Sequence, residues 1–291
     1  MSEPDMPPRK SSRNIQQSSP QNTQQSSPRN IQRSSPRSIG TERESSLHRA
    51  LKFRYAVSED RTEALMGNYV CDGISDTGEI IEVQTGSFGP LKRKAPELAQ
   101  MGKVRIVHPI IITKYIELTD APGNILHRRK SPRKGSLWDL FKALIYAPEL
   151  PRVQNITIEL VLVDLVESRV QDGRGSWRRK GVSIADKRLE NYLGSVLLSA
   201  LRDYYQFIPF KKGEEFTVRD LGERAKIAPA LAGKALYVLN KLEIVEKLYR
   251  KGNAQVYGIK TGAKKPAKTG RKAPDTTARK TSDKQKKGPE K

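Results

Sequence analysis

The stretch that decides the fold reads NYVCDGISDTGEIIEVQ and spans residues 68–84. Two β-strand patterns, 68–74 and 79–86, lie on either side of the turn sequence Ser75-Asp-Thr-Gly78. A three-residue Asp-Thr-Gly loop with Gly78 at positive φ closes a hairpin and places Asp72 directly opposite Glu82. The sequence therefore predicts that this hairpin brings two carboxylates to one side of a sheet.

Side-chain alternation predicts chemistry at this hairpin. Glu82 and Gln84 share one face of their strand, so two carboxylates and an amide oxygen converge with Asp72. Mg²⁺ or Mn²⁺ prefers a few hard oxygen ligands and keeps waters, one of which can attack a phosphodiester. The alternative is an exposed, solvated face, because burying both acids without a cation is costly.

The spacing of these residues resembles the core of the PD-(D/E)xK nuclease superfamily. Asp72 is followed by nine residues and then Glu82-Val83-Gln84, with a helix before the hairpin and a basic segment and another strand after it. The resemblance covers about residues 44–115 and implies that Asp72 and Glu82 are metal ligands. It also implies a lysine where this chain has Gln84, which cannot supply a positive charge.

This departure leaves two interpretations open. Either Lys92 or Lys94, in the segment GPLKRK (89–94), takes the role of the missing lysine, or the site binds nucleic acid without cutting it. On the preceding helix, Glu44 and His48 lie four residues apart and share a face. The resemblance makes Glu44 a further candidate metal ligand, although an acid in the first turn also favours the helix dipole.

The remaining patterns predict an α/β fold, a restriction-endonuclease-like mixed sheet flanked by helices. The hydrophobic periodicity predicts helices over 47–55, 137–147 and 184–205 and strands over 104–112 and 155–166. A glycine-rich basic loop is expected over 169–182. We place this nuclease-like domain at residues 44–208.

The basic loop combines an aromatic ring with cations, which suits phosphate contact and base stacking. Its residues are Trp177, Arg178, Arg179 and Lys180. A second basic run, which includes Arg129 and Lys130, lies in residues 127–134. The alternatives are that Trp177 packs beneath the loop and that the second run is a solvated loop.

Residues 209–260 resemble a winged helix-turn-helix domain. Thr217 is a good N-cap for a first helix, Pro229 favours the start of a second, and a hairpin follows around residues 250–253. The resemblance implies that the second helix enters a DNA major groove and that the wing touches phosphates. The implied contact residues are Lys234, Tyr237, Lys241, Arg250 and Lys251. A dimerisation or protein-docking role is the alternative.

The charge of the chain favours a polyanion partner. The 291 residues carry 54 Lys and Arg against 32 Asp and Glu, a net charge of +22. One cysteine, Cys71, excludes an intramolecular disulfide framework and a cysteine-cluster zinc site. No run approaches the roughly 18 apolar residues that a membrane span needs, and no apolar signal segment precedes the fold. We expect a cytoplasmic protein that is not secreted and does not bind membranes, with nucleoid association left open.

Polar low-complexity sequence forms both tails. Residues 1–43 contain a period-eight Ser/Gln/Pro repeat and are expected to be disordered. Residues 261–291 are rich in Lys, Ala and Pro, resemble linker-histone-like tails and are expected to act as a disordered basic arm.

Together these patterns predict a nucleic-acid-binding protein whose leading activity is Mg²⁺- or Mn²⁺-dependent DNA hydrolysis by an endonuclease. The rival is a catalytically inactive, nuclease-like DNA-binding or regulatory protein. RNA is the second candidate partner, and the oligomeric state is left open.

Overall fold

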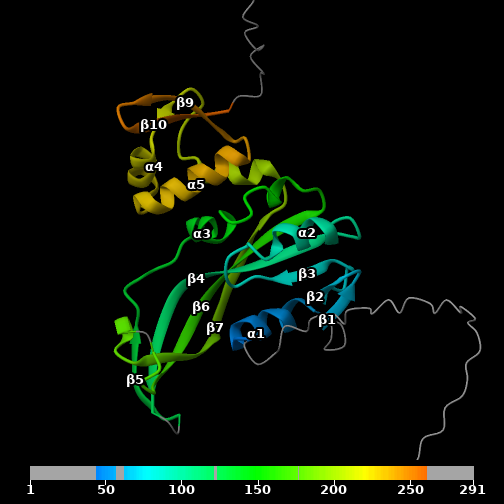
Figure 1. Cartoon of the computed structure of the whole chain (residues 1–291), viewed down its shortest axis with the longest axis vertical. Helices are drawn as coiled ribbons and strands as arrows, with labels where there is room; N and C mark the ends of the chain where they lie inside the picture. The colour runs from blue at the N-terminus through cyan, green and yellow to red at the C-terminus, as the bar shows by residue number, and fades with distance from the viewer. Residues whose placement is uncertain (1–43, 57–61, 121–122, 176, 261–291) are drawn as a thin grey trace, which may run out of the picture. The chain divides into compact units, whose positions relative to one another are not determined.

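A computed structural model describes residues 44–56, 62–120, 123–175 and 177–260 (Figure 1). The predictions for the two tails, residues 1–43 and 261–291, lie outside the described residues. The described part has a mixed α/β architecture, a mixed sheet flanked by helices. None of its helices is long and apolar enough to cross a bilayer.

The predicted first helix and hairpin are present. Helix α1 (Ser46–Tyr55) begins after Ser45, whose hydroxyl accepts a hydrogen bond from the His48 N–H. Strands β2 (Tyr69–Ile74) and β3 (Ile80–Val83) pair antiparallel across a turn in which Gly78 has a φ of +78°. Strand β1 (Thr62–Met66), which the sequence patterns did not indicate, pairs with the outer edge of β2.

Helix α2 (Leu91–Leu98) carries the chain from β3 to the long strand β4 (Val104–Thr119), which runs parallel to β3. Strand β6 (Ile156–Gln171) is parallel to β4, and β7 (Val182–Leu198) is antiparallel to β6. The sheet order is β1-β2-β3-β4-β6-β7, and β5 (Ile125–Lys130) pairs with the far end of β4.

Alternation along β3, β4 and β6 fills two apolar layers, one on each face of the sheet. Leu47 and Leu51 of α1 pack with Ile81, Val107 and Val163 on one face. The opposite face packs against α2 and α3 (Leu140–Leu144), and its core includes Ile80, Ile106, Ile158, Leu91 and Phe141. Figure 1 shows α1 on one side of the sheet and α2 and α3 on the other.

The C-terminal segment has the predicted order of helix, helix and hairpin. It contains α4 (Val218–Ala225), α5 (Pro229–Lys241), β9 (Val245–Lys251) and β10 (Ala254–Ile259), and β8 (Glu215–Phe216) completes a three-stranded sheet. Thr217 caps α4 as predicted, through a reciprocal pair of hydrogen bonds with Asp220. Helix α5 packs against α3, and one apolar cluster includes residues from both sides of residue 209.

Two further predictions need correction. The helix predicted over 184–205 is wrong, because β7 and the 3₁₀ helix η6 (Leu201–Phe207) occupy these residues. Strand β7 pairs with β6 from Leu198 back to Val182, and this non-local pairing outweighs the apparent helical pattern. The loop predicted over 169–182 is shorter, since β6 continues to Gln171; the short 3₁₀ helix η5 (Trp177–Arg179) lies within it.

The helix predicted over 137–147 consists of the 3₁₀ helix η3 (Leu137–Asp139) followed by α3. A further 3₁₀ turn, η4 (Leu150–Arg152), leads into β6. These short pieces connect β4 and β6 on the face that α5 covers.

Candidate active site and nucleic-acid interface

The β2–β3 hairpin sets the positions of Asp72 and Glu82. The register pairs Ile74 with Ile80 and Gly73 with Ile81, so Asp72 comes next, opposite Glu82. The backbone pairing of β2 and β3 ends at Gly73. At the next position the Asp72 side chain bridges the strands, because its Oδ2 accepts a hydrogen bond of 2.7 Å from the Val83 N–H. The two acids therefore lie where β2 and β3 begin to separate.

Helix α1 supplies the cations that face Asp72. His48 Nε2 lies 3.5 Å from Asp72 Oδ2, and Lys52 Nζ lies 3.9 Å from Asp72 Oδ1. Burial alone would raise the pKa of Asp72. The hydrogen bond and charge of His48, the Val83 N–H and Lys52 together lower that pKa below its ordinary value. Asp72 is consequently held as a carboxylate.

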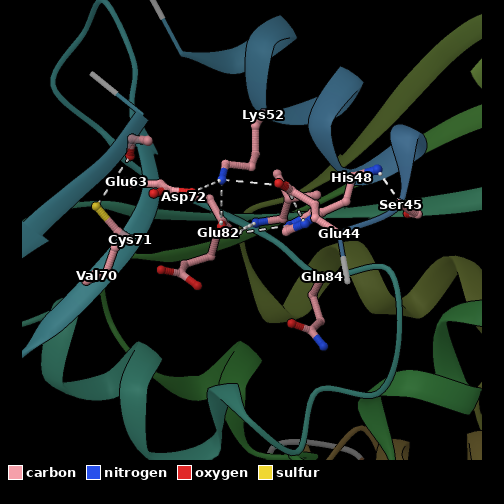
Figure 2. Close-up of polar contacts among 12 residues, drawn as sticks. Glu44, Ser45, His48, Lys52, Glu63, Val70, Cys71, Asp72, Glu82 and Gln84 are labelled. Carbon is pink, nitrogen blue, oxygen red and sulfur yellow. Dashed lines mark hydrogen bonds and ion pairs between the residues drawn. The ribbon is translucent and has the colours of Figure 1, made fainter. Parts of the chain in front are cut away.

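Glu44 lies on the other side of the same imidazole. Its Oε1 is 2.8 Å from His48 Nδ1 and 3.5 Å from Lys52 Nζ. Burial would lower the pKa of His48, but Asp72 and Glu44 outweigh it and raise that pKa. Figure 2 shows Glu44, His48, Lys52 and Asp72 converging. The predicted proximity of Glu44 and His48 is present, but Glu44 precedes the Ser45 cap and lies outside α1.

Glu82 has a separate cation. Its side chain is only 3% exposed, and its Oε1 lies 2.6 Å from Lys94 Nζ of α2. Lys94 also donates to the Val70 carbonyl at 2.7 Å, so its amine is held between β2 and β3. Burial, assisted by the charge of Asp72, raises the pKa of Glu82 to about 7 despite Lys94.

The structure distinguishes between Lys92 and Lys94, which the sequence left as alternatives. Lys94 contacts Glu82, whereas Lys92 is exposed. The Gln84 amide donates to the Ser87 carbonyl at 2.7 Å, and Figure 2 shows it pointing away from Asp72 and Lys52. Gln84 is therefore not among the side chains that converge with Asp72.

Lys52 and Glu63 belong to the site, although neither was predicted from the sequence. Lys52 is 7% exposed and lies 3.1 Å from Glu63 Oε1 of β1. A signal for Lys52 was present, because Lys52 follows His48 by four residues and so shares its helix face. Glu63 gave no such signal, since β1 itself was not predicted.

The carboxylate oxygens of this cluster are of the kind that could hold a magnesium ion. Mg²⁺ is commonly bound by one or two carboxylates together with substrate phosphates. Glu44 Oε1 and Glu82 Oε1 are buried, and the ion pairs with His48, Lys52 and Lys94 are their only polar contacts in the described residues. In the same part of the chain, no three His, Cys, Asp or Glu side chains are grouped to enclose a metal.

The residues predicted to contact DNA from the C-terminal segment differ in accessibility. Tyr237 is 47% exposed, and Lys241, Arg250 and Lys251 are exposed as well. Lys234 is half-buried beside α3. Because α5 packs against α3 and buries Ala232, Ala235, Leu236, Val238 and Leu239, only part of its surface is open to a ligand.

The two other basic segments are exposed. Trp177 is 83% exposed and does not pack beneath its loop; the Arg178 guanidinium lies 5.6 Å from its ring centre. Lys180 is exposed, and the side chain of Arg179 lies outside the described residues. Arg129 and Lys130 lie in β5 and point into solvent.

Comparison with known proteins identifies a family but no activity. The family model described as "Domain of unknown function (DUF8091)" matches residues 45–199. The chain is also similar to a protein of Treponema pallidum (strain Nichols), described as an uncharacterized protein, with 31% identity over 151 residues. That match covers 52% of this chain and 60% of the relative. No solved structure matches the chain.

Proposed function

The chain belongs to the DUF8091 family, and we propose that it is a nucleic-acid-binding protein that hydrolyses DNA phosphodiester bonds with Mg²⁺ or Mn²⁺. One observation carries the proposal: Lys94 lies 2.6 Å from Glu82, beside Asp72. The amine of Lys94 supplies the positive charge that Gln84 cannot provide. The acid pair and a nearby amine are the side chains that a metal-dependent phosphodiesterase needs.

Each side chain has a distinct role in this proposal. Asp72 and Glu82 would hold the ion, which when bound supplies a Lewis acid and an activated water. Lys94 Nζ would stabilise the negative charge that develops on the phosphate oxygens. His48, between Glu44 and Asp72, is positioned to take up or release a proton at Nε2, and Lys52 keeps Glu44 and Glu63 in place.

The arrangement of elements around the site also supports the proposal. We infer a restriction-endonuclease-like core from the order α1, β1–β3, α2 and β4, in which a helix precedes the acidic hairpin and a basic helix follows it. We likewise infer that α4, α5, β9 and β10 are a winged-helix module. Tyr237, Lys241, Arg250 and Lys251 are its accessible candidates for DNA contact.

A second function, DNA binding without cleavage, has its own support. His48, Lys52 and Lys94 already compensate the charges of Glu44, Asp72 and Glu82. A carboxylate cluster satisfied in this way is stable without a metal, which suits a scaffold. RNA remains the alternative partner, supported by the exposed Trp177 and its neighbouring cations.

Plasmid nicking tests the activity. Purified protein is incubated with supercoiled plasmid with and without Mg²⁺ or Mn²⁺, alongside Glu82→Ala and Asp72→Asn. Asp76→Asn, an exposed acid in the turn of the same hairpin, is the matched control. We expect metal-dependent nicking by the wild type and Asp76→Asn, with a loss of at least about 100-fold in the two site variants. A gel shift without nicking by any protein would instead establish the scaffold function.

A further inference from the structure

A basic pocket of about 390 Å³ lies between the η3–α3 segment and the start of α5. Its volume falls in the range of small-molecule sites, and charged side chains line it together with apolar ones such as Ile227 and Leu231. The lining residues with ionisable side chains are Arg133, Lys134, Asp139, Lys142, Lys226 and Lys234. The pocket lies away from the Asp72 and Glu82 cluster, on different elements.

Four of these cations have no acidic partner in the described residues: Arg133, Lys134, Lys226 and Lys234. The fifth, Lys142, pairs with Asp139, the single acid of the lining. The pocket is therefore lined by four cations that no acid of the described residues compensates. Concentrated charge of one sign attracts counter-ions of the other, and a concave wall focuses the field.

The fold fixes both walls of the pocket. Next to Lys134, a side chain at Gly135 would place its Cβ 2.1 Å from the Ile111 carbonyl oxygen, so Gly135 lets this segment lie directly against β4. On the other wall, Lys226 ends α4 with a φ of +53°, and the Ile227 N–H donates to the Gly222 carbonyl. These contacts fix the backbone at Gly135 and at the end of α4, next to cations on each wall.

We propose that this pocket binds a phosphate group of a nucleic-acid backbone. Arginine and lysine donate hydrogen bonds to phosphate oxygens. Four uncompensated cations carry more positive charge than is needed to neutralise a single carboxylate, so a phosphate is the better match. The proposal rests on the nucleic-acid partner of the proposed function but not on cleavage. It gives α5 a phosphate contact at Lys234 in addition to the candidate contacts at Tyr237 and Lys241, while the apolar face of the helix stays packed on α3.

Binding of a fluorescein-labelled 20-base-pair duplex, followed by anisotropy at several NaCl concentrations, tests the pocket. One full-length variant combines Lys226→Asn, which tolerates the positive φ, with Lys234→Gln. A second combines Arg133→Gln and Lys134→Gln from the opposite wall. The matched control combines Lys211→Gln and Lys212→Gln, two exposed lysines outside the pocket.

We expect each pocket variant to bind the duplex about tenfold more weakly at 150 mM NaCl, with a log–log salt slope shallower by about 2. The control should change affinity less than about twofold. Equal losses in control and pocket variants would overturn the proposal in favour of diffuse surface attraction. The titrations contain no divalent metal and measure binding alone, so a failed nicking assay leaves this inference intact.

A second experiment distinguishes a free phosphate compound from a nucleic-acid backbone as the ligand. Inorganic pyrophosphate is titrated into the wild type and the Lys226→Asn, Lys234→Gln variant while thermal unfolding is recorded. Protection of the wild type by pyrophosphate, together with no duplex binding, would overturn the nucleic-acid assignment and identify a free phosphate compound as the ligand. Duplex binding that is lost with the pocket charges supports the proposal.

Discussion

At the scale of the residue, Lys94 of the neighbouring helix α2 brings a positive charge to Glu82, whereas Gln84, directly after β3, carries none. In the proposed hydrolysis, the stabilisation of the phosphate depends on where the positive charge lies and not on which element carries it. Leu91, Ala95 and Leu98 form the buried stripe of α2, and Lys94 borders that stripe while Lys92 lies on the solvent side. Helical periodicity thus distinguishes the two lysines once the helix itself is known.

This placement predicts unequal effects of the two lysines. We expect Lys94→Ala to reduce metal-dependent plasmid nicking by about 100-fold or more, because the developing phosphate charge loses its nearest amine. Lys92→Ala, two residues away in the same helix, should change nicking less than about threefold. Circular dichroism checks that both variants fold. If Lys94→Ala cuts as fast as Lys92→Ala, another cation stabilises the transition state.

A second residue-scale prediction concerns His108 of β4. Its ring is buried edge-on against Phe88 at 5.1 Å between centroids, and its Nδ1 bonds to the Gln84 carbonyl. Burial lowers the pKa of His108 below the ordinary value of 6.5. The unfolded chain therefore takes up a proton below pH 6.5 that the folded chain does not, so this contribution to stability is present above pH 6.5 and lost as pH falls.

Urea unfolding of wild type and His108→Asn from pH 7.5 to 5 checks this effect. We expect the free energy of unfolding of the wild type to fall more steeply below pH 6.5, by up to about 1.4 kcal/mol per pH unit from this group. Other titrating groups are shared by the two proteins and cancel in the difference. Parallel pH profiles would contradict a neutral, buried His108.

At the scale of the element, one buried acid joins three strands. Glu117 of β4 is 1% exposed, and its carboxylate pairs with Arg128 of β5 at 3.1 Å and with Arg188 of β7 at 2.9 Å. Arg128 also pairs with Glu190 near the surface at 2.6 Å. The long ends of the sheet are therefore held together by charge as well as by backbone pairing.

Removing the central acid should cost more than removing the outer one. We expect Glu117→Ala to lower the free energy of unfolding by about 2 kcal/mol, because two arginines lose a buried partner although they keep part of their hydration. Glu190→Ala, which pairs with the same Arg128 nearer to solvent, should cost less than about 1 kcal/mol. Chemical denaturation measures both. Equal costs would mean that burial does not strengthen the Glu117 pairs.

Elements that a short turn or cap motif marks were predictable, and strands without such a motif or a clear alternation were not. The Asp-Thr-Gly turn and the Thr217 cap gave the acidic hairpin and α4, since both act within a few residues. Strand β7 was expected as a helix because its residues show no clear alternation, and its pairing with the preceding strand β6 decides its conformation. Strand β5, with fully exposed side chains, had no alternation to reveal it.

At the scale of the whole molecule, the same limit applies to the candidate sites. Asp72 and Glu82 were predictable because the hairpin register places them. Glu44 was expected near His48 from a spacing of four residues, and it lies there although it precedes α1. The choice of Lys94, the inclusion of Glu63 and the basic pocket required knowledge of how α2, β1 and α5 pack. Pocket residues such as Lys142 and Lys226 come from segments far apart in sequence, so no spacing pattern connects them.

The distribution of charge predicts that residues 261–291 contribute to nucleic-acid binding without sequence preference. Residues 261–291 carry 11 basic and 3 acidic side chains, with no pattern that would read base edges. Deleting them should weaken binding by the same factor for duplexes of different sequence. The log–log salt slope should become shallower by roughly 0.9 for every phosphate that the shortened chain no longer neutralises.

Anisotropy titrations of the full-length chain and of residues 1–260, with two duplexes of unrelated sequence, check this division of labour. Replacing the tail lysines and arginines by glutamine, at constant length, is the matched control and should reproduce the deletion. Lys241→Ala should instead weaken duplex DNA more than RNA, because an exposed lysine of α5 acts from a structured surface whereas the tail acts through charge alone. If the effect of the deletion depends on duplex sequence, this prediction is wrong. Residues 261–291, and not α5 and the β9–β10 hairpin, would then recognise bases.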